Sequence, residues 1–433
     1  MRCYWVVLVL LVLDVVLATS SPTPVNNYQV LAGHQIWRAE GGSEVAAVMG
    51  RLEEEGLVDI LGHSIASTFR VFPGTKDSVS TSLQREGIKY HVVVPDLGRH
   101  LAEEERRVKR EILSSQGETC FENDCPKPLT QRYMTYVEIA WYLHELAAKS
   151  PRVELKSIGK TFENRDIWLV HIKPTAKEGT KKRDAIWMEG GIHAREWISE
   201  AVTLQLLDKL ASDDTTLTRN IDIYCVPIAN PDGYEYSRNT DRLWRKNRAI
   251  DPSMERDCTG VDLNRNWSTG YGVGASTNPC SEVYQGSAPF SELETRALKK
   301  EMTRVSSVNN LRLVMAVHSF GQKLYHPWGF TKKEAPNTAE MKKAGLAFAQ
   351  AAAKGSRGRK GAQYEVTSSS ELYLASGATD DWAKATLDVP YAYTLELPDE
   401  GLHGFVLPSN FIKPAAQDVW RGMKKLIPMV LNK

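Results

Sequence analysis

The chain carries almost no excess of either charge, and this balance excludes one large class of function. Its 433 residues include 54 Lys and Arg against 53 Asp and Glu, which leaves a net charge of +1. A nucleic-acid-binding protein normally shows a basic excess, so nucleic acid is not an expected partner. With 42% hydrophobic and 25% charged residues, the composition is typical of a soluble globular protein.

Long hydrophobic runs are scarce, and the one candidate lies at residues 1–20. Arg2 precedes an apolar run from Tyr4 to Ala18, and small residues close it at Ala18-Thr-Ser20. This pattern is typical of a secretory signal peptide. The alternative, a membrane anchor, is disfavoured because the run is short for a bilayer span. We therefore expect a secreted, extracellular protein that meets an oxidising compartment and has no membrane partner.

Cysteine is also sparse, with six residues, one of them inside the leader. Five remain, so at least one must be free or pair between chains. Cys225 lies in an apolar run and is expected to be a small buried side chain. We predict a disulfide between Cys258 and Cys280, across a loop rich in Gly, Ser and Asn. Cys120 and Cys125 are candidates for a second disulfide, which the sequence supports less strongly.

Residues 21–110 have the size and pattern of a small α+β domain. Strand patterns occur at Tyr28–Leu31, Ser67–Phe72 and Tyr90–Pro95, and helical periodicity runs from Glu44 to Glu55. A separate small domain is therefore expected before residue 111.

A charged stretch, Glu103-Glu-Glu-Arg-Arg-Val-Lys-Arg110, follows this domain. It is either a solvated helix end or a cleavable linker, and we favour cleavage because nicking concentrates in exposed boundary segments. Cleavage after Arg110 is predicted, with Arg106, Arg107 or Lys109 as alternatives. The expected organisation is a signal peptide at 1–20, a propeptide at 21–110 and a catalytic domain at 111–433.

From about residue 130, helical stretches alternate with apolar, β-rich runs. This pattern predicts an α/β fold with a mixed, mostly parallel twisted sheet and helices on both faces. Ligands bind at the carboxyl ends of the strands in such sheets. Glu189, His318 and Glu396 fall at or just past the ends of strand runs.

Two histidines and one glutamate form a candidate zinc site. His193 and Glu196 lie in Gly191-Ile-His-Ala-Arg-Glu-Trp197, and His318 lies far downstream. Two imidazoles and one carboxylate leave a fourth zinc coordination position open for water, as in hydrolytic zinc sites. An isolated His-x-x-Glu is weak evidence, since it also occurs in ordinary packing.

Other motifs strengthen this reading: Asn230-Pro-Asp-Gly233, Arg242-Leu-Trp-Arg-Lys-Asn247, Gly260-Val-Asp-Leu-Asn-Arg-Asn-Trp267, Leu372-Tyr-Leu-Ala-Ser-Gly377 and Thr394-Leu-Glu396. In this order and spacing they resemble the motifs of the secreted zinc carboxypeptidases of the pancreatic A/B family, in precursor form. The likeness covers almost everything after the leader. It implies the carboxypeptidase fold, preceded by a small α+β open-sandwich propeptide, and one zinc ion per catalytic domain.

The resemblance also implies the catalytic roles. His193, Glu196 and His318 match the zinc ligands, and Asp262 matches an aspartate that orients a ligand imidazole. Glu396 matches the catalytic glutamate, which exchanges a proton with water and the leaving amine. Arg245 matches the arginine that stabilises the oxyanion.

The substrate-binding residues follow from the same resemblance. Asn264 and Arg265 match the pair that grips a terminal carboxylate, which restricts the enzyme to chain ends. Arg195, Tyr373 and Ser319 match further substrate-contacting positions. The absence of His-Glu-x-x-His also argues against a zinc endopeptidase.

The expected base of the specificity pocket lies seven positions after Tyr373, at Asp380. In this family an aspartate there accompanies release of Lys and Arg, and an apolar residue accompanies release of hydrophobic residues. Ser368, a second expected wall position, is small and polar. One alternative is that Asp380 is only a solvated loop acid beside Asp381. The other is an enzyme that releases hydrophobic residues.

The resemblance implies that the propeptide caps the site and acts as an intramolecular inhibitor until an activating endoprotease removes it. Peptide or protein C-termini are the expected substrates, and we expect a monomer. A catalytically dead binding protein of the same fold is a further alternative. Loss of Glu396, Arg245 or a zinc ligand would mark such a relative, and all are present.

Overall fold

The computed structural model describes residues 28–431, apart from 64–65, 104–128, 130–131, 177–181, 213–216, 251–257, 356–359 and 372. The predicted leader, the cleavage position at Arg110 and the candidate second disulfide Cys120–Cys125 lie outside the described residues. No helix within the described ranges has the length and apolar character needed to cross a bilayer.

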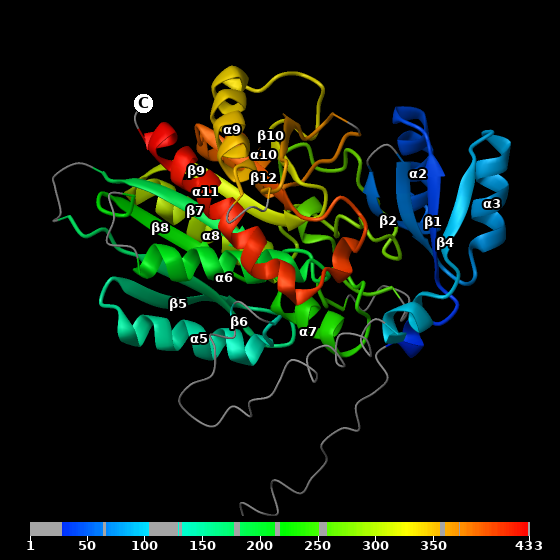
Figure 1. Ribbon diagram of the computed structural model, residues 1–433, viewed down its shortest axis with the longest axis horizontal. Coiled ribbons are helices and arrows are strands. Elements are labelled where there is room, and N and C mark those ends of the chain that lie inside the picture. Colours follow the sequence, from blue (N-terminus) through cyan, green and yellow to red (C-terminus); the bar gives the residue numbers. More distant parts are fainter. Residues whose placement is uncertain are drawn as a thin grey trace, which may run out of the picture.

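The N-terminal unit is a four-stranded antiparallel sheet with two helices (Figure 1). Its strand order is β2-β3-β1-β4, with β1 (Gln35–Glu40), β2 (Val58–His63), β3 (Ala66–Val71), β4 (Tyr90–Val94), α2 (Ser43–Glu54) and α3 (Lys76–Arg85). Met49 of α2, Leu83 of α3 and Phe69 of β3 are completely buried in one apolar core. The expected small α+β unit is thus present.

One predicted strand of this unit is wrong. Residues Gln29–Leu31 form a short 3₁₀ helix, and the first strand begins at Gln35. Leu31 is completely buried in a cluster that includes Leu97 and Phe405, while Val30 is 51% exposed. The apolar residues here fill a contact with the larger unit of the chain, at Leu243 and Phe405, so they carry no alternating strand pattern.

The larger unit is built on an eight-stranded mixed sheet in the order β11-β10-β12-β9-β7-β8-β6-β5. The strands are β5 (Val153–Lys160), β6 (Asp166–Ile172), β7 (Asp184–Gly190), β8 (Ile221–Val226), β9 (Asn310–Ser319), β10 (Lys323–His326), β11 (Glu365–Ser368) and β12 (Tyr391–Leu397). The central pairs β12–β9, β9–β7 and β7–β8 are parallel, and β10–β12, β6–β8 and β5–β6 are antiparallel. Helices cover both faces, as predicted.

Helices cover both faces of the sheet (Figure 1), and each face has its own apolar core. One face is covered by α5 (Tyr136–Lys149), α6 (Trp197–Ser212), α9 (Thr338–Ala353) and α11 (Ile412–Leu431), with α7 (Pro231–Asn239) beside them. The other is covered by α8 (Leu293–Val308) and α10 (Thr379–Leu387). Local signals agree with these bounds: Thr135 and Glu138 form a capping box at the start of α5.

The parallel strands β7, β9 and β12 end at the same edge of the sheet. Glu396 of β12 is directly opposite His318 of β9 in this register. The N-terminal unit lies against the loops at this edge (Figure 1), where Asp59 of β2 contacts Arg195. The topology therefore brings residues from separate parts of the chain to one place.

The predicted disulfide between Cys258 and Cys280 is confirmed. Cys225 is a free cysteine on β8 and is completely buried, as its apolar surroundings indicated.

Candidate active site

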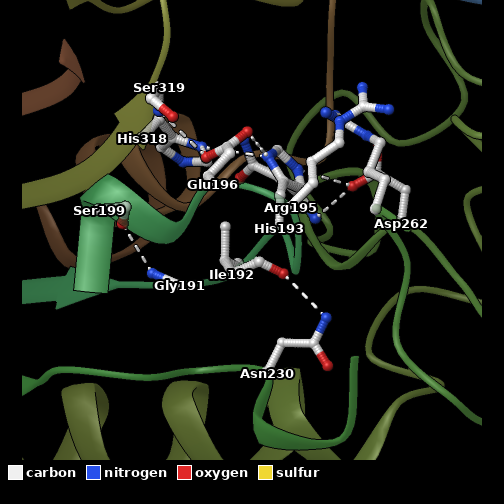
Figure 2. A network of polar contacts seen from close by, with 12 residues as sticks. Gly191, Ile192, His193, Arg195, Glu196, Ser199, Asn230, Asp262, His318 and Ser319 are labelled. Atoms are coloured by element: carbon white, nitrogen blue, oxygen red, sulfur yellow. Dashed lines mark hydrogen bonds and ion pairs between the residues drawn. The ribbon is translucent and has the colours of Figure 1, made fainter. Parts of the chain in front are cut away.

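The two histidines and the glutamate of the candidate metal site converge (Figure 2). His193 and Glu196 lie on the loop between β7 and α6, and His318 lies near the end of β9. Glu196 is 2.7 Å from Nδ1 of His193 through one oxygen and 3.0 Å from Nδ1 of His318 through the other. All three side chains are buried.

This donor set fits Zn²⁺. One ligand atom from each residue lies within 4.8 Å of the others, and the set contains two imidazole nitrogens and one carboxylate. Zinc prefers such ligands, and three protein ligands leave one position for water or substrate. The structure therefore contains the elements of a catalytic zinc site.

Asp262 ties this metal site to its neighbours. Its Oδ1 accepts hydrogen bonds from Nε2 of His193 at 3.1 Å and from the backbone N–H of Asn264 at 2.9 Å. Its Oδ2 accepts from Nε and Nη2 of Arg245 at 3.0 and 2.8 Å. Burial alone would raise the pKa of Asp262, but Arg245 and His193 hold it well below its usual range. A permanent carboxylate therefore orients the His193 ring.

The loop that carries His193 is shaped by a tight backbone contact. Gly191 has φ +64°, and a Cβ there would lie 2.7 Å from Cγ of Glu200. Its N–H donates to Oγ of Ser199 at 2.8 Å, and Asn230 donates to the carbonyl of Ile192 at 3.2 Å (Figure 2). Glycine is required because other residues adopt this conformation only with strain.

A cavity of about 170 Å³ opens beside the metal site. Its lining includes eleven of the predicted site residues: His193, Arg195, Glu196, Arg245, Asn264, Arg265, His318, Ser319, Tyr373, Asp380 and Glu396. Glu396 is on β12, and its Oε2 is buried without a hydrogen-bond partner. Burial raises the pKa of Glu396 to about 8. A cation bound nearby would lower that value.

The two aspartates at the start of α10 have different environments. Asp380 lines the cavity and is 2% exposed, and Oγ of Ser369 lies 3.4 Å from its Oδ2. Asp381 accepts hydrogen bonds from the backbone N–H groups of Gly329 and Phe330 at 2.9 and 3.2 Å. Asp381 thus fixes the loop at Gly329 and Phe330, whereas Asp380 lines the cavity.

The structure places Ser368 differently from the sequence prediction. Its Oγ donates to the carbonyl of Trp328 at 3.2 Å and lies 3.1 Å from Oγ of Ser370. Ser369, the next residue, lines the cavity instead. β11 ends at Ser368, and the side chain that reaches the cavity is that of Ser369, at the start of the following turn.

Other cavity-lining residues were not predicted as site residues from the sequence, among them Lys323, Ile60 and Leu61. Lys323 begins β10, a short strand with no distinctive pattern. Ile60 and Leu61 come from β2 of the N-terminal unit and reach the mouth of the cavity. No local signal marks Ile60 and Leu61, because they reach the cavity only through the packing of the two units.

Comparisons with known proteins agree with this geometry. Residues 139–422 match the family model described as zinc carboxypeptidase. Mouse carboxypeptidase A4 is 36% identical over 361 residues, and the match covers 81% of each chain. Carboxypeptidase B of Astacus astacus is 36% identical over 298 residues, and that match covers 67% of this chain and 95% of that protein. The chain belongs to the zinc carboxypeptidase family. Zinc is therefore its cofactor, and peptide C-termini are its substrates.

Solved structures extend the likeness to the N-terminal unit. Carboxypeptidase A from Helicoverpa armigera has a TM-score of 0.81 at 26% identity, covering 93% of this chain and 98% of that one. Thrombin-activatable fibrinolysis inhibitor has a TM-score of 0.75 at 25% identity, covering 93% of this chain and all of that one. The relatives carry both A and B names, so the names do not decide the released residue.

Replacing Asp262 tests its link to the metal site. In Asp262→Asn the amide presents a donor towards His193 or Arg245, so we expect zinc affinity to fall about 10- to 100-fold. The matched control is Asp222→Asn, a second buried aspartate, which lies 2.6 Å from Nε2 of His171. Competition with a chelator measures the affinity, and equal values for Asp262→Asn and wild type would contradict this role.

Proposed function

We propose that this zinc carboxypeptidase is made as a secreted precursor and preferentially releases Lys and Arg. The observation that carries the specificity is Asp380, a buried carboxylate lining the substrate cavity. None of the ion pairs within the described ranges joins it to a lysine or arginine. A guest guanidinium or ammonium would supply the missing partner, whereas an apolar guest would leave the charge unpaired.

The chain end is held by Asn264 and Arg265. Both are buried on the short turn after Asp262, and Oδ1 of Asn264 accepts the backbone N–H of Thr379 at 3.2 Å. Nη1 of Arg265 donates to the carbonyl of Asn264 at 2.9 Å, while Nε is buried without a partner. The planar guanidinium suits a terminal carboxylate. An internal peptide segment offers no such group, which makes the enzyme an exopeptidase.

Arg245 and Glu396 supply the remaining catalytic groups. His193, Glu196 and His318 would hold the zinc ion, which would supply polarisation of the scissile carbonyl and a lower pKa for the attacking water. Arg245, fixed by Asp262, donates hydrogen bonds to the oxygen that becomes negative. Glu396 takes the proton from water and returns it to the leaving amine, a role that suits a carboxylate lining the cavity beside the metal site with an oxygen free of hydrogen bonds.

The N-terminal unit serves as an inhibitory propeptide in this proposal. Asp59 of β2 is completely buried, and Nη1 of Arg195 donates to its Oδ2 at 2.5 Å. Ile60 and Leu61 line the cavity beside it. With these residues in place, a substrate chain cannot approach Arg195. The unit therefore obstructs the cavity through Asp59, Ile60 and Leu61.

A second set of buried ion pairs holds the propeptide against the catalytic domain. Arg70 of β3 lies 3.3 Å from Oδ2 of Asp59, 3.3 Å from Asp241 and 3.4 Å from Glu282. It is 1% exposed, so these pairs are screened little by salt. Because Asp241 and Glu282 belong to the catalytic domain, Arg70 joins the two units.

The disulfide-closed loop of the catalytic domain also holds the propeptide. Ser281, Ser276 and Asn278 donate to the carbonyls of residues 53, 54 and 55 at 2.8, 2.7 and 3.3 Å. These carbonyls lie at the C-terminal end of α2, where a helix lacks internal donors. The Cys258–Cys280 bond also supports the proposal of secretion, because disulfides persist in oxidising compartments.

Peptide substrates differing only in terminal Arg or Phe test the specificity of the trypsin-activated protein. We expect a higher kcat/KM for Arg in the wild type. In Asp380→Ile the Arg preference should fall by two orders of magnitude or more, because breaking a buried pair costs roughly 3–5 kcal/mol. Wild-type preference for Phe would overturn the proposal in favour of an A-like enzyme.

The same carboxylate predicts a pH dependence. Burial raises the pKa of Asp380 above its ordinary value, so a larger fraction is neutral in mild acid. The Arg-to-Phe ratio of kcat/KM should therefore rise with pH as Asp380 ionises. In Asp380→Ile this ratio should not change with pH, and a pH-independent ratio in the wild type would contradict the assignment.

Glu396→Gln tests the proton-transfer role. We expect kcat to fall at least about 100-fold, in line with general acid–base contributions, while zinc content stays at one ion per chain. Glu400→Gln, an exposed neighbour, is the control and should keep full activity. Zinc is measured by mass spectrometry. An active Glu396→Gln variant would refute the role.

Asp59→Ala tests the inhibitory contact in the uncleaved, zinc-loaded precursor. Removing Asp59 leaves Arg195 and Arg70 facing each other without their shared anion, so the propeptide should bind less tightly. We expect the intrinsic activity on a small Arg-terminal peptide to rise more than about tenfold. Glu86→Ala, which breaks the exposed pair with Arg51, should change nothing. An unchanged Asp59→Ala precursor would argue against this contact.

A further inference from the structure

A second, larger cavity lies between the N-terminal unit and the catalytic domain. Its volume is about 350 Å³, within the range of small-molecule sites. Both units line it, with residues Ile36, Arg38, Leu61, Thr68, Val93, Val94, Leu97, His100 and Leu101 on one side and Leu243, Phe320 and 401–406 on the other. It therefore exists only while the two units are together.

Most of this seam cavity is apolar. Ile36, Leu97 and Leu101 of the N-terminal unit form one buried cluster with Leu243 and Phe405 of the catalytic domain. The cavity continues from this cluster to the surface, where Leu402 is 88% exposed. An apolar body placed here would remove hydrophobic surface of both units from water, which is favourable.

The polar lining residues have one sign of charge. Arg38 of β1 is permanently cationic, and the imidazoles of His100 and His403 are further polar groups of the lining. Aspartate and glutamate are absent from the described lining. An apolar cavity with a basic rim is complementary to a molecule with a hydrocarbon body and an anionic head.

We propose that the seam cavity binds a medium-chain fatty carboxylate as a soluble monomer. Its chain contacts the apolar residues of both units, and its carboxylate pairs with Arg38. A ligand that binds only the joined units stabilises them against separation. Such a carboxylate therefore slows release of the N-terminal unit after cleavage. The inference rests on the proposed function only in treating that unit as a removable propeptide.

The chain's own segment after Glu103 is the rival occupant. Its sequence has mixed charge: four basic residues at 106, 107, 109 and 110 are flanked by Glu104, Glu105 and Glu111. The basic residues are repelled by Arg38, and the acidic ones are short polar side chains without the hydrocarbon body that the seam cavity accepts. Charge complementarity therefore favours a separate anionic ligand.

Binding of decanoate to the full-length, zinc-loaded precursor tests the site. Calorimetry, kept below the concentration at which decanoate aggregates, should show one molecule per chain. Arg38→Gln should weaken binding about tenfold, whereas Arg51→Gln, an exposed arginine of α2 paired with Glu86, should not. Decyltrimethylammonium, which has the same chain and the opposite charge, should not bind. No decanoate binding, or equal binding of the cation, would overturn the proposal.

A cavity-filling variant separates this proposal from a general effect of fatty acid. Thr68→Trp places a large side chain in the seam cavity and should abolish decanoate binding. Decanoate should slow the appearance of activity after trypsin cleavage of the wild type but not of Thr68→Trp. Equal slowing of both would show that decanoate acts on trypsin and would contradict the site. Because calorimetry needs no catalysis, its result is independent of whether Arg-terminal peptides are cleaved.

Discussion

The hydrogen bonds of one buried carboxylate, Asp262, determine the geometry of the site. Through Oδ1 it holds the ring of His193 and the backbone of Asn264, and through Oδ2 it holds both nitrogens of Arg245. The metal site, the proposed contact with the chain end and the proposed oxyanion contact thus share one anchor. Because preorganised groups need no rearrangement during the reaction, this sharing places the three functions at fixed relative positions.

The sequence predicted the metal ligands and the long helices because both have local signals. His193-Ala-Arg-Glu196 is a short motif, and Tyr136–Lys149 shows helical periodicity with a capping box. It did not predict β10 or β11, four-residue strands that are stabilised by pairing within the sheet rather than by their own composition. The wrong strand at 28–31 and the shift from Ser368 to Ser369 have the same origin, since tertiary packing decided both.

The N-terminal unit joins the site through charge as well as shape. Asp59 and Arg70 are buried among partners from the catalytic domain, and such pairs stabilise an interface only while every member stays in place. Disturbing one contact therefore weakens the whole set. Nothing in the local sequence around Asp59 distinguishes it from a surface acid, so its position became evident only from the fold.

The central claim is that a zinc site held by Asp262 acts on a free chain end. The most direct measurement compares an Arg-terminal peptide with its C-terminal amide, using activated protein of known zinc content. We predict rapid hydrolysis of the free acid with one zinc per chain, and almost none of the amide, which lacks the carboxylate for Asn264 and Arg265. Equal hydrolysis of both peptides, or activity that survives complete removal of zinc, would contradict the account.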